Sequence, residues 1–536
     1  AIISASATED LYVDNMHYMG GCLLADNLSE ATVMFAFNSL PPDPAIVGDR
    51  WREMWHERLR GSGLWLDTWL SHQRRDEYWK PASVVEDYSQ VQIPVMAVGG
   101  WADGYTNAIF RLMENLDVPR KGLIGPWGHK YPHMGVPGPA IGFLQEVVRW
   151  WDHWLKGKDT GLMEEPMVRA WMQEFVPPSA SAEDRPGRWV AESSWPAPHI
   201  DHRRYSLSRH HLVQQPHEEL DSYAQPLRSP LSVGMFAGKW ASYSAVPDLP
   251  YDQREEDGGA LVFESDPLTE PLEVFGLPSL DVEVSADKPV AQLAVRLSDV
   301  GLTGEATRVT YGVLNLTHRD GSADPQPLEP GRRYRVRVDL NGVAQRFPAG
   351  HRLRLSVSTS YWPLIWPAPE PATVTLYTGV SSLELPVREP RAEDEELRPF
   401  GEPETAPPLE VTPVQPGEHS WRVTRDLATD VSTLEIVNDQ GAFRIEETGS
   451  QIRRSTREWY SFRWNDVNSV RGETQTVRRV EREDWNVEVR TRTVLTSTPT
   501  DFVISAQLDA YELDAQQGDP RVYSQNWQRS IPRHLV

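Results

Sequence analysis

Two short segments place an aspartate and a histidine directly after apolar runs. Gly99-Gly100-Trp101-Ala102-Asp103 follows one run, and Gly125-Pro126-Trp127-Gly128-His129 follows another. A carboxylate that holds a histidine ring fixes its tautomer, and the histidine can then take the proton of a serine hydroxyl. Asp103 and His129 are therefore predicted to be a catalytic acid and base. Each also has a structural alternative, a helix N-cap for Asp103 and a packed side chain for His129.

The elements that must position these residues alternate between strand and helix. Residues 93–100 and 121–125 are apolar runs that end in glycine, which is typical of parallel strands buried on both faces. Residues 105–116 between them have helical spacing. This order predicts a parallel α/β sheet, in which ligands bind beyond the carboxyl ends of the strands. Asp103 and His129 are thus expected to face one crevice.

Three further segments belong to this first part of the chain. Residues 1–6 read as a short buried strand, with no initiator methionine and no charged leader before it. Residues 143–155 have a strong amphipathic pattern, which predicts a helix that ends at Gly157. Residues 49–59 carry tryptophans at helical spacing, which indicates either a lid over a pocket or packing against the body.

A serine nucleophile is the missing part of this constellation. A nucleophile turn of the type Gly-x-Ser-x-Gly holds the serine between two glycines. Gly379-Val380-Ser381 is the nearest imitation, but Ser382-Leu383 follows in place of the closing glycine, and the surrounding pattern is rich in strands. We therefore expect Ser381 to be structural.

The remainder of the chain is dominated by predicted strands. Residues 334–340 and 353–358 alternate between apolar and polar side chains, as in sheets with one buried face. Residues 389–416 are rich in proline and glutamate and indicate a linker or a wrapping strand. Residues 485–490 and 502–513 again suggest antiparallel strands. We assign no function to this last region.

The Asp103 and His129 motifs resemble those of the cocaine esterase/X-Pro dipeptidyl-peptidase family, the CocE/NonD serine hydrolases. The resemblance implies an α/β hydrolase fold (partial, a parallel sheet with a helical cap), followed by a jelly-roll β-sandwich and a further β-rich C-terminal domain. It also implies that Asp103 is the triad acid and His129 the triad base. It extends over residues 17–21, 69–72, 78–79, 145–146, 154–157, 285–289, 295–300 and 314–319, roughly the first three-quarters of the chain.

The chain departs from this family at the nucleophile. Family members carry a Gly-x-Ser-Tyr-x-Gly elbow before the strand that resembles residues 1–6, and their oxyanion hole uses the next amide and an upstream tyrosine. We therefore expect an N-terminally truncated serine hydrolase, a carboxylic-ester hydrolase or X-Pro dipeptidyl-peptidase-like enzyme, whose nucleophile lies upstream and whose fragment is inactive. The alternative is a non-catalytic binding or scaffold protein with a degraded hydrolase domain.

The same comparison narrows the substrate. Relatives that bind an α-amino group place acidic residues just after the triad aspartate, whereas this chain has Tyr105 and Thr106 there. The resemblance therefore disfavours α-amino-acid esters among the small-molecule esters and amides. If the tryptophan-rich helices form a lid, their rings favour a neutral or apolar acyl group. The expected domains are residues 1–28 with 88–160 (hydrolase), 29–87 (helical cap), 161–390 (jelly roll), 391–416 (linker) and 417–536 (C-terminal domain).

Composition limits the partners. The 536 residues carry a formal net charge of −24, which disfavours nucleic acid and anionic lipid surfaces. No apolar run reaches the roughly 20 residues of a membrane-spanning helix. The single Cys22 cannot form an internal disulfide, and the histidines at 202, 210, 211 and 217 read as a solvated loop. We expect no metal, no cofactor and a cytoplasmic location, and leave open an upstream signal peptide and a homo-oligomer.

Overall fold

The computed structural model describes residues 1–216, 220–243, 247–483, 485–513 and 519–536. These residues form two compact units, each assembled from separate stretches of the chain. The first unit comprises residues 1–24, 74–405 and 535–536, and the second comprises residues 25–73 and 406–534. The helical segment expected over 29–87 is therefore divided between the units, and residues 391–405 of the expected linker belong to the first.

A parallel sheet opens the first unit, as the alternating strand and helix pattern predicts. The strands pair in the order β1 (Ile2–Ala5), β4 (Val95–Gly100), β5 (Arg120–Gly125) and β6 (Val168–Gln173). Helix α5 (Thr106–Asn115) packs Ile109 and Met113 with Val95, Ala97 and Ile124 of the sheet. Helix α6 (Phe143–Lys156) packs Trp150 with Met96, Val98 and Leu123, and these alternate with the first set along the strands. The apolar runs are thus covered on both faces.

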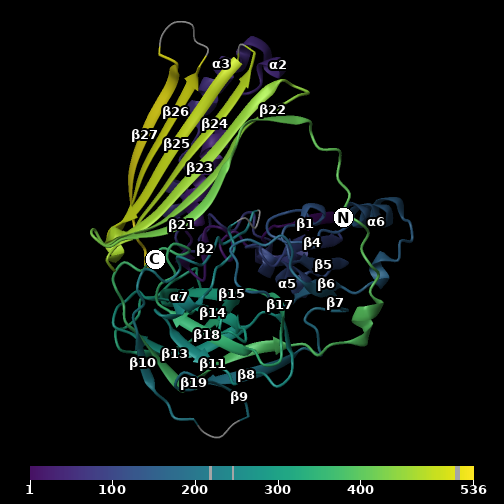
Figure 1. The fold of residues 1–536 in the computed structure, drawn as a ribbon, viewed down its shortest axis with the longest axis vertical. Helices are drawn as coiled ribbons and strands as arrows, with labels where there is room; N and C mark the ends of the chain where they lie inside the picture. Colours follow the sequence, from purple (N-terminus) through teal and green to yellow (C-terminus); the bar gives the residue numbers. More distant parts are fainter. Residues whose placement is uncertain (217–219, 244–246, 484, 514–518) are drawn as a thin grey trace. The chain divides into compact units, whose positions relative to one another are not determined.

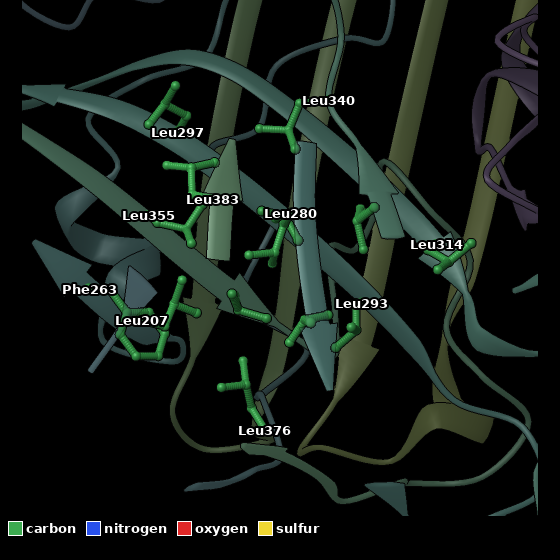
Figure 2. Close-up of a cluster of buried hydrophobic side chains, with 14 of the residues drawn as sticks. Leu207, Phe263, Leu280, Leu293, Leu297, Leu314, Leu340, Leu355, Leu376 and Leu383 are labelled. Carbon is green, nitrogen blue, oxygen red and sulfur yellow. The ribbon is translucent and has the colours of Figure 1, made fainter. Parts of the chain in front are cut away.

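A β-sandwich follows. One of its sheets runs β17 (Val343–Phe347), β12 (Leu272–Gly276), β19 (Val374–Val387), β13 (Ser279–Ala286) and β16 (Arg333–Asp339). The other runs β11 (Leu261–Glu264), β18 (Arg352–Ser358), β14 (Gln292–Val300) and β15 (Ala306–Asn315). Leucines of both sheets, among them Leu280, Leu293, Leu355 and Leu383, gather in one buried cluster (Figure 2). The expected sandwich is present, and its finer jelly-roll topology stays a prediction.

The parallel sheet and the sandwich are continuous, because β6 pairs with β17 through Gln173 and Gln345. Ser381 lies inside β19, where its hydroxyl donates to the Tyr377 carbonyl at 2.7 Å and accepts from the Glu283 amide. These bonds agree with the structural interpretation of Ser381. The remaining strands and α-helix of this unit are β2 (Tyr18–Met19), β3 (Cys22–Leu23), β7 (Gly187–Glu192), β8 (Asp201–Leu207), β9 (Leu212–Gln214), β10 (Ala224–Leu227) and α7 (Arg254–Asp257).

The second unit combines helices from early in the chain with strands from its end. The helices are α1 (Asp26–Asn38), α2 (Pro44–Val47), α3 (Trp51–Gly61) and α4 (Trp65–Ser71). The strands are β20 (Val411–Gln415), β21 (Glu418–Asp426), β22 (Val431–Ile445), β23 (Ser450–Arg463), β24 (Arg471–Arg482), β25 (Trp485–Ser497), β26 (Asp501–Glu512) and β27 (Arg521–Pro532). Strands β22 to β27 lie side by side in chain order as one antiparallel sheet (Figure 1).

Packing inside this second unit accounts for the tryptophans of residues 49–59. Helix α1 lies against β24 and β25, so closely that a Cβ on Gly472 would come within 2.5 Å of Leu28. Trp51 and Trp55 are buried, and the Trp51 ring lies 6.1 Å from that of Trp485. Of the two alternatives for these tryptophans, the contacts favour packing. Among the described residues, no helix is both long and apolar enough to cross a membrane.

Candidate active site

The turn after β4 positions Asp103. The Asp103 amide donates to the Gly100 carbonyl at 3.1 Å, which closes a tight turn at the end of the strand. Helix α5 then begins, with Tyr105 at its N-cap position and no side-chain hydrogen bond capping it. Asp103 is therefore not a helix cap. Its carboxylate is available for another contact.

The turn after β5 brings His129 beside it. Gly100 of β4 pairs in register with Gly125 of β5, so the two strands end together. A Cβ on Gly100 would lie 2.0 Å from the Trp127 carbonyl oxygen, and only glycine allows this approach. The Ala102 amide then donates to the Trp127 carbonyl at 3.0 Å. The glycines of the two motifs thus join the turns that carry the acid and the base.

A third segment, around Ser242, forms backbone hydrogen bonds with both turns. The His129 amide donates to the Ser242 carbonyl at 2.6 Å, and the Ser242 amide donates to the Ala102 carbonyl at 2.9 Å. The Ser242 hydroxyl donates to Oδ1 of Asp248 at 2.7 Å. Sequence reasoning missed Ser242. Its role rests on backbone groups, which leave no pattern in residue types.

The two predicted residues meet directly. Nδ1 of His129 lies 3.2 Å from Oδ1 of Asp103, with the Asp103 side chain fully buried and the His129 side chain 31% exposed. Oδ2 of Asp103 is buried and has no hydrogen-bond partner among the described residues. A buried carboxylate next to a partly exposed imidazole orients the ring and stabilises its protonated form. The arrangement suits general acid-base catalysis.

Aromatic rings flank the imidazole. The rings of Tyr105 and Tyr243 lie 5.4 Å and 5.3 Å from that of His129. Trp240 packs edge-on against Tyr105 at 5.1 Å, and the Tyr105 hydroxyl donates to Oδ1 of Asn15 at 3.0 Å. Sequence reasoning placed Tyr105 here but missed Trp240 and Tyr243, which lie more than a hundred positions further along the chain. These rings limit the positions that the imidazole can take.

Asp103 also lines a polar cavity. Its lining includes Asp103, Thr106, Lys239, Asp299 and Arg308. Asp299 pairs there with a second histidine, because Nδ1 of His351 lies 2.8 Å from its Oδ1.

The cysteine and the histidines considered above as possible reactive or metal-binding residues have environments typical of structural or surface residues. Cys22 is buried, and burial raises the pKa of its thiol well above the usual range, so it is no reactive thiolate. Nδ1 of His202 lies 3.1 Å from Oε1 of Glu384 on the neighbouring strand. His210 and His211 are exposed, and His217 lies outside the described residues. No group of three or more metal-binding side chains is found in the part of the chain that the structure describes.

Comparisons with known proteins agree with this architecture. Residues 1–131 match the X-Pro dipeptidyl-peptidase (S15) family, and residues 160–390 match the X-Pro dipeptidyl-peptidase C-terminal non-catalytic domain. A Mycobacterium bovis protein named as a serine esterase is 27% identical over 346 residues, which cover 58% of this chain and 52% of that protein. The cocaine esterase of Rhodococcus sp. is 23% identical over 325 residues, covering 56% and 54%.

A solved α-amino acid ester hydrolase shares the fold, with a TM-score of 0.54 and 19% identity over 72% of each chain. The class of protein that this fold defines is that of the α/β hydrolase fold followed by β-rich domains. The chain spans about half the length of the curated relatives it matches. It belongs to the cocaine esterase and X-Pro dipeptidyl-peptidase family of CocE/NonD hydrolases.

Proposed function

We propose that Asp103 and His129 are the acid and the base of a serine hydrolase that cleaves esters or amides through an acyl-enzyme. The observation that carries this proposal is the 3.2 Å contact between His129 Nδ1 and the fully buried Asp103 carboxylate, at the carboxyl ends of two adjacent parallel strands. The sequence predicts both residues from the ends of the same two strands. Support also comes from the family of hydrolases to which the chain belongs.

The chemistry follows from the roles of the two groups. His129 takes the proton of the serine hydroxyl as the oxygen attacks the acyl carbon, and gives it to the leaving group as the tetrahedral intermediate collapses. Water then attacks the acyl-enzyme, with His129 again accepting and returning the proton. Asp103 holds the imidazole through Nδ1, so proton exchange takes place at Nε2, and its negative charge stabilises the imidazolium.

We further propose that the nucleophile is a serine carried outside residues 1–536. Ser242, which contacts both turns, has another role, since its hydroxyl donates to Asp248. On the side of β1 away from β4, the described residues supply no partner strand. A further parallel strand paired there would end at the same crevice as β4 and β5.

The residues around His129 indicate which acyl group the substrate carries. Tyr105 and Thr106 follow Asp103, and neither can pair with the ammonium group of an α-amino acid. The neighbouring rings of Tyr105 and Tyr243 suit a neutral or apolar acyl group. The proposed substrate class is therefore a neutral carboxylic ester or amide.

Labelling with a fluorophosphonate probe tests the proposal on the protein as its gene encodes it. The probe reacts with a serine only when a base activates it. We expect the natural protein to be labelled and His129→Ala to lose labelling by about 100-fold or more. His133→Ala removes a nearby histidine that stacks on Phe143, and it should label normally.

Ser6 provides a second control. It follows β1 with a positive φ of 50°, so Ser6→Ala tests whether a serine of this chain reacts instead. We expect Ser6→Ala to label normally. Equal labelling of the natural protein and His129→Ala would contradict the assignment of the base. No labelling of either would support the non-catalytic alternative.

A further inference from the structure

A second cavity, of about 260 Å³, lies at the other end of the parallel sheet. We call it the basic cavity. Its walls include apolar and cationic side chains, among them Met96, Leu123, Leu162, Phe400, Lys121 and Arg169. Met96, Lys121 and Arg169 occupy the first halves of β4, β5 and β6, whereas Asp103 and His129 follow the carboxyl ends of β4 and β5. The basic cavity is thus separate from the candidate active site.

Lys121 is a buried cation whose ammonium group forms no ion pair with a carboxylate of the described residues. Its residue is 8% exposed, and Nζ donates to the backbone carbonyls of Glu165 and Pro166. Burial lowers the pKa of Lys121 to about 8, and the nearby Arg149 lowers it further while Glu165 opposes the shift. At neutral pH the ammonium group is still protonated. An anion in the cavity would stabilise this charged form.

Arg169 is the second such cation. Its guanidinium lies over the ring of Phe400 at 3.9 Å and near that of Trp189 at 5.4 Å. Nε is buried without a hydrogen-bond partner, and Arg169 forms no ion pair among the described residues. Guanidinium N–H groups without partners are costly in a buried setting and match the two oxygens of a carboxylate.

Two of the three carboxylates around the basic cavity are already paired with arginines. Glu146 and Glu165 each pair with both Arg149 and Arg398. Glu396 also lines the cavity, but its side chain is exposed. Four cations, Lys121, Arg149, Arg169 and Arg398, therefore surround three carboxylates, Glu146, Glu165 and Glu396, an excess of one positive charge in a chain whose net charge is −24. This local excess of positive charge favours an anion.

A strap of the chain, residues 391–405, supplies one wall. Leu397, Arg398 and Phe400 of this strap line the cavity. The strap is held to α6 because the Gly142 amide donates to the Gly401 carbonyl at 2.7 Å, and Nε2 of Gln145 donates to the Glu402 carbonyl at 3.0 Å. The apolar walls are thus fixed in place around the two cations.

We propose that the basic cavity binds a small amphipathic carboxylate, with the carboxylate on Arg169 and Lys121 and its apolar body against Met96, Leu123 and Leu162. Bidentate contact with Arg169 would satisfy the guanidinium, and the apolar walls would exclude ions that lack an apolar body. The inference does not depend on the proposed hydrolase activity, because none of its residues belongs to that site.

Calorimetric titration of the full chain with octanoate at pH 7 tests the proposal. We expect octanoate to bind at one site, with octanol and inorganic phosphate each binding at least tenfold more weakly. Arg169→Met and Lys121→Met remove one cation each and should weaken octanoate binding by tenfold or more. Arg120→Met is the matched control: Arg120 neighbours Lys121 on β5 and also donates to backbone carbonyls, those of Met113 and Val118, but it does not line the cavity.

A cavity-filling variant keeps the test decisive if a cation variant misfolds. Leu397→Trp changes a half-buried residue of the strap and should reduce octanoate affinity without changing the circular dichroism spectrum. Unchanged affinity in Leu397→Trp, or in both cation variants, overturns the proposal. So does octanol binding as tightly as octanoate, because the site would then be only an apolar hole. Loss of binding in Arg120→Met would show surface charge attraction instead of this cavity.

Discussion

The first unit holds two aspartate–histidine pairs of nearly the same chemistry in different settings. His129 lies 3.2 Å from Asp103, and His351 lies 2.8 Å from Asp299, each through Nδ1. In both pairs the second carboxylate oxygen is buried without a hydrogen-bond partner among the described residues. Both aspartates also line the same polar cavity. Distance and residue type alone therefore do not distinguish a catalytic pair from a structural one.

The two pairs differ in how exposed the histidine side chain is and in which elements carry the residues. The His129 side chain is 31% exposed, and turns after parallel strands carry the pair. The His351 side chain is 9% exposed, the ring of Phe175 covers it at 4.7 Å, and Asp299 lies inside β14. A base must reach a substrate, so the first arrangement suits catalysis and the second suits stability. The comparison makes accessibility of the imidazole the deciding feature.

The largest expected effect separates the two pairs by activity. Asp103→Asn keeps the shape of the acid but removes the charge that orients the imidazole, so kcat for 4-nitrophenyl acetate should fall by about 10⁴-fold in the protein as its gene encodes it. Asp299→Asn is the matched change in the second pair and should leave kcat of the folded protein unchanged. An equal loss of activity in both variants would show that the second pair also serves the reaction.

The next effect separates them by stability. His351→Ala leaves the Asp299 carboxylate buried without its partner, which should cost about 3 kcal/mol of unfolding free energy at pH 7.5. Burial raises the pKa of Asp299 to about 6, and Glu305 raises it slightly while His351 lowers it. Below that pH the folded protein holds the carboxyl neutral, so the cost of losing His351 should shrink as pH falls from 7.5 to 5.

Urea unfolding at both pH values measures this difference, with His129→Ala as the comparison. Because water reaches the partly exposed His129 position, His129→Ala should cost only about 1 kcal/mol. A larger loss in His129→Ala than in His351→Ala would reverse the assignment of the structural role.

The smallest expected effect tests the segment around Ser242, which is hydrogen-bonded to the turns that carry Asp103 and His129. Ser242→Ala removes the hydrogen bond to Asp248 but keeps the backbone bonds to His129 and Ala102, so it should cost about 1 kcal/mol of stability. Fluorophosphonate labelling of this variant should match that of the natural protein. Loss of labelling would instead make the Ser242 hydroxyl part of the reaction.

The sequence was sufficient to predict the first pair but not the second. Apolar runs that end in glycine revealed the ends of two parallel strands, and that topology brings Asp103 to His129 whatever the rest of the fold does. Asp299 and His351 come together only through the antiparallel register of β14 and β18, which also pairs Asp299 with Leu353. Nothing in the residue types around them specifies that register.

The sequence also did not predict which part of the chain packs against the helices near its start. Periodicity over residues 49–59 identified the apolar face with Trp51 and Trp55, but it cannot say which surface covers that face. The structure places the Trp51 ring against Trp485, far along the chain. The basic cavity was missed for the same reason, since Lys121 and Arg169 meet only once three strands and the strap are assembled.

The division of the second unit between two distant stretches has a consequence for the order of folding. Roughly 330 residues separate its helices from its strands. Chains emerge from the ribosome at about 5–20 residues per second, so helices α1 to α4 wait on the order of tens of seconds for the sheet that buries them. During that interval Leu28, Phe35 and Trp51 lack the strand residues that bury them in the folded unit, so the nascent helices are expected to bind a chaperone.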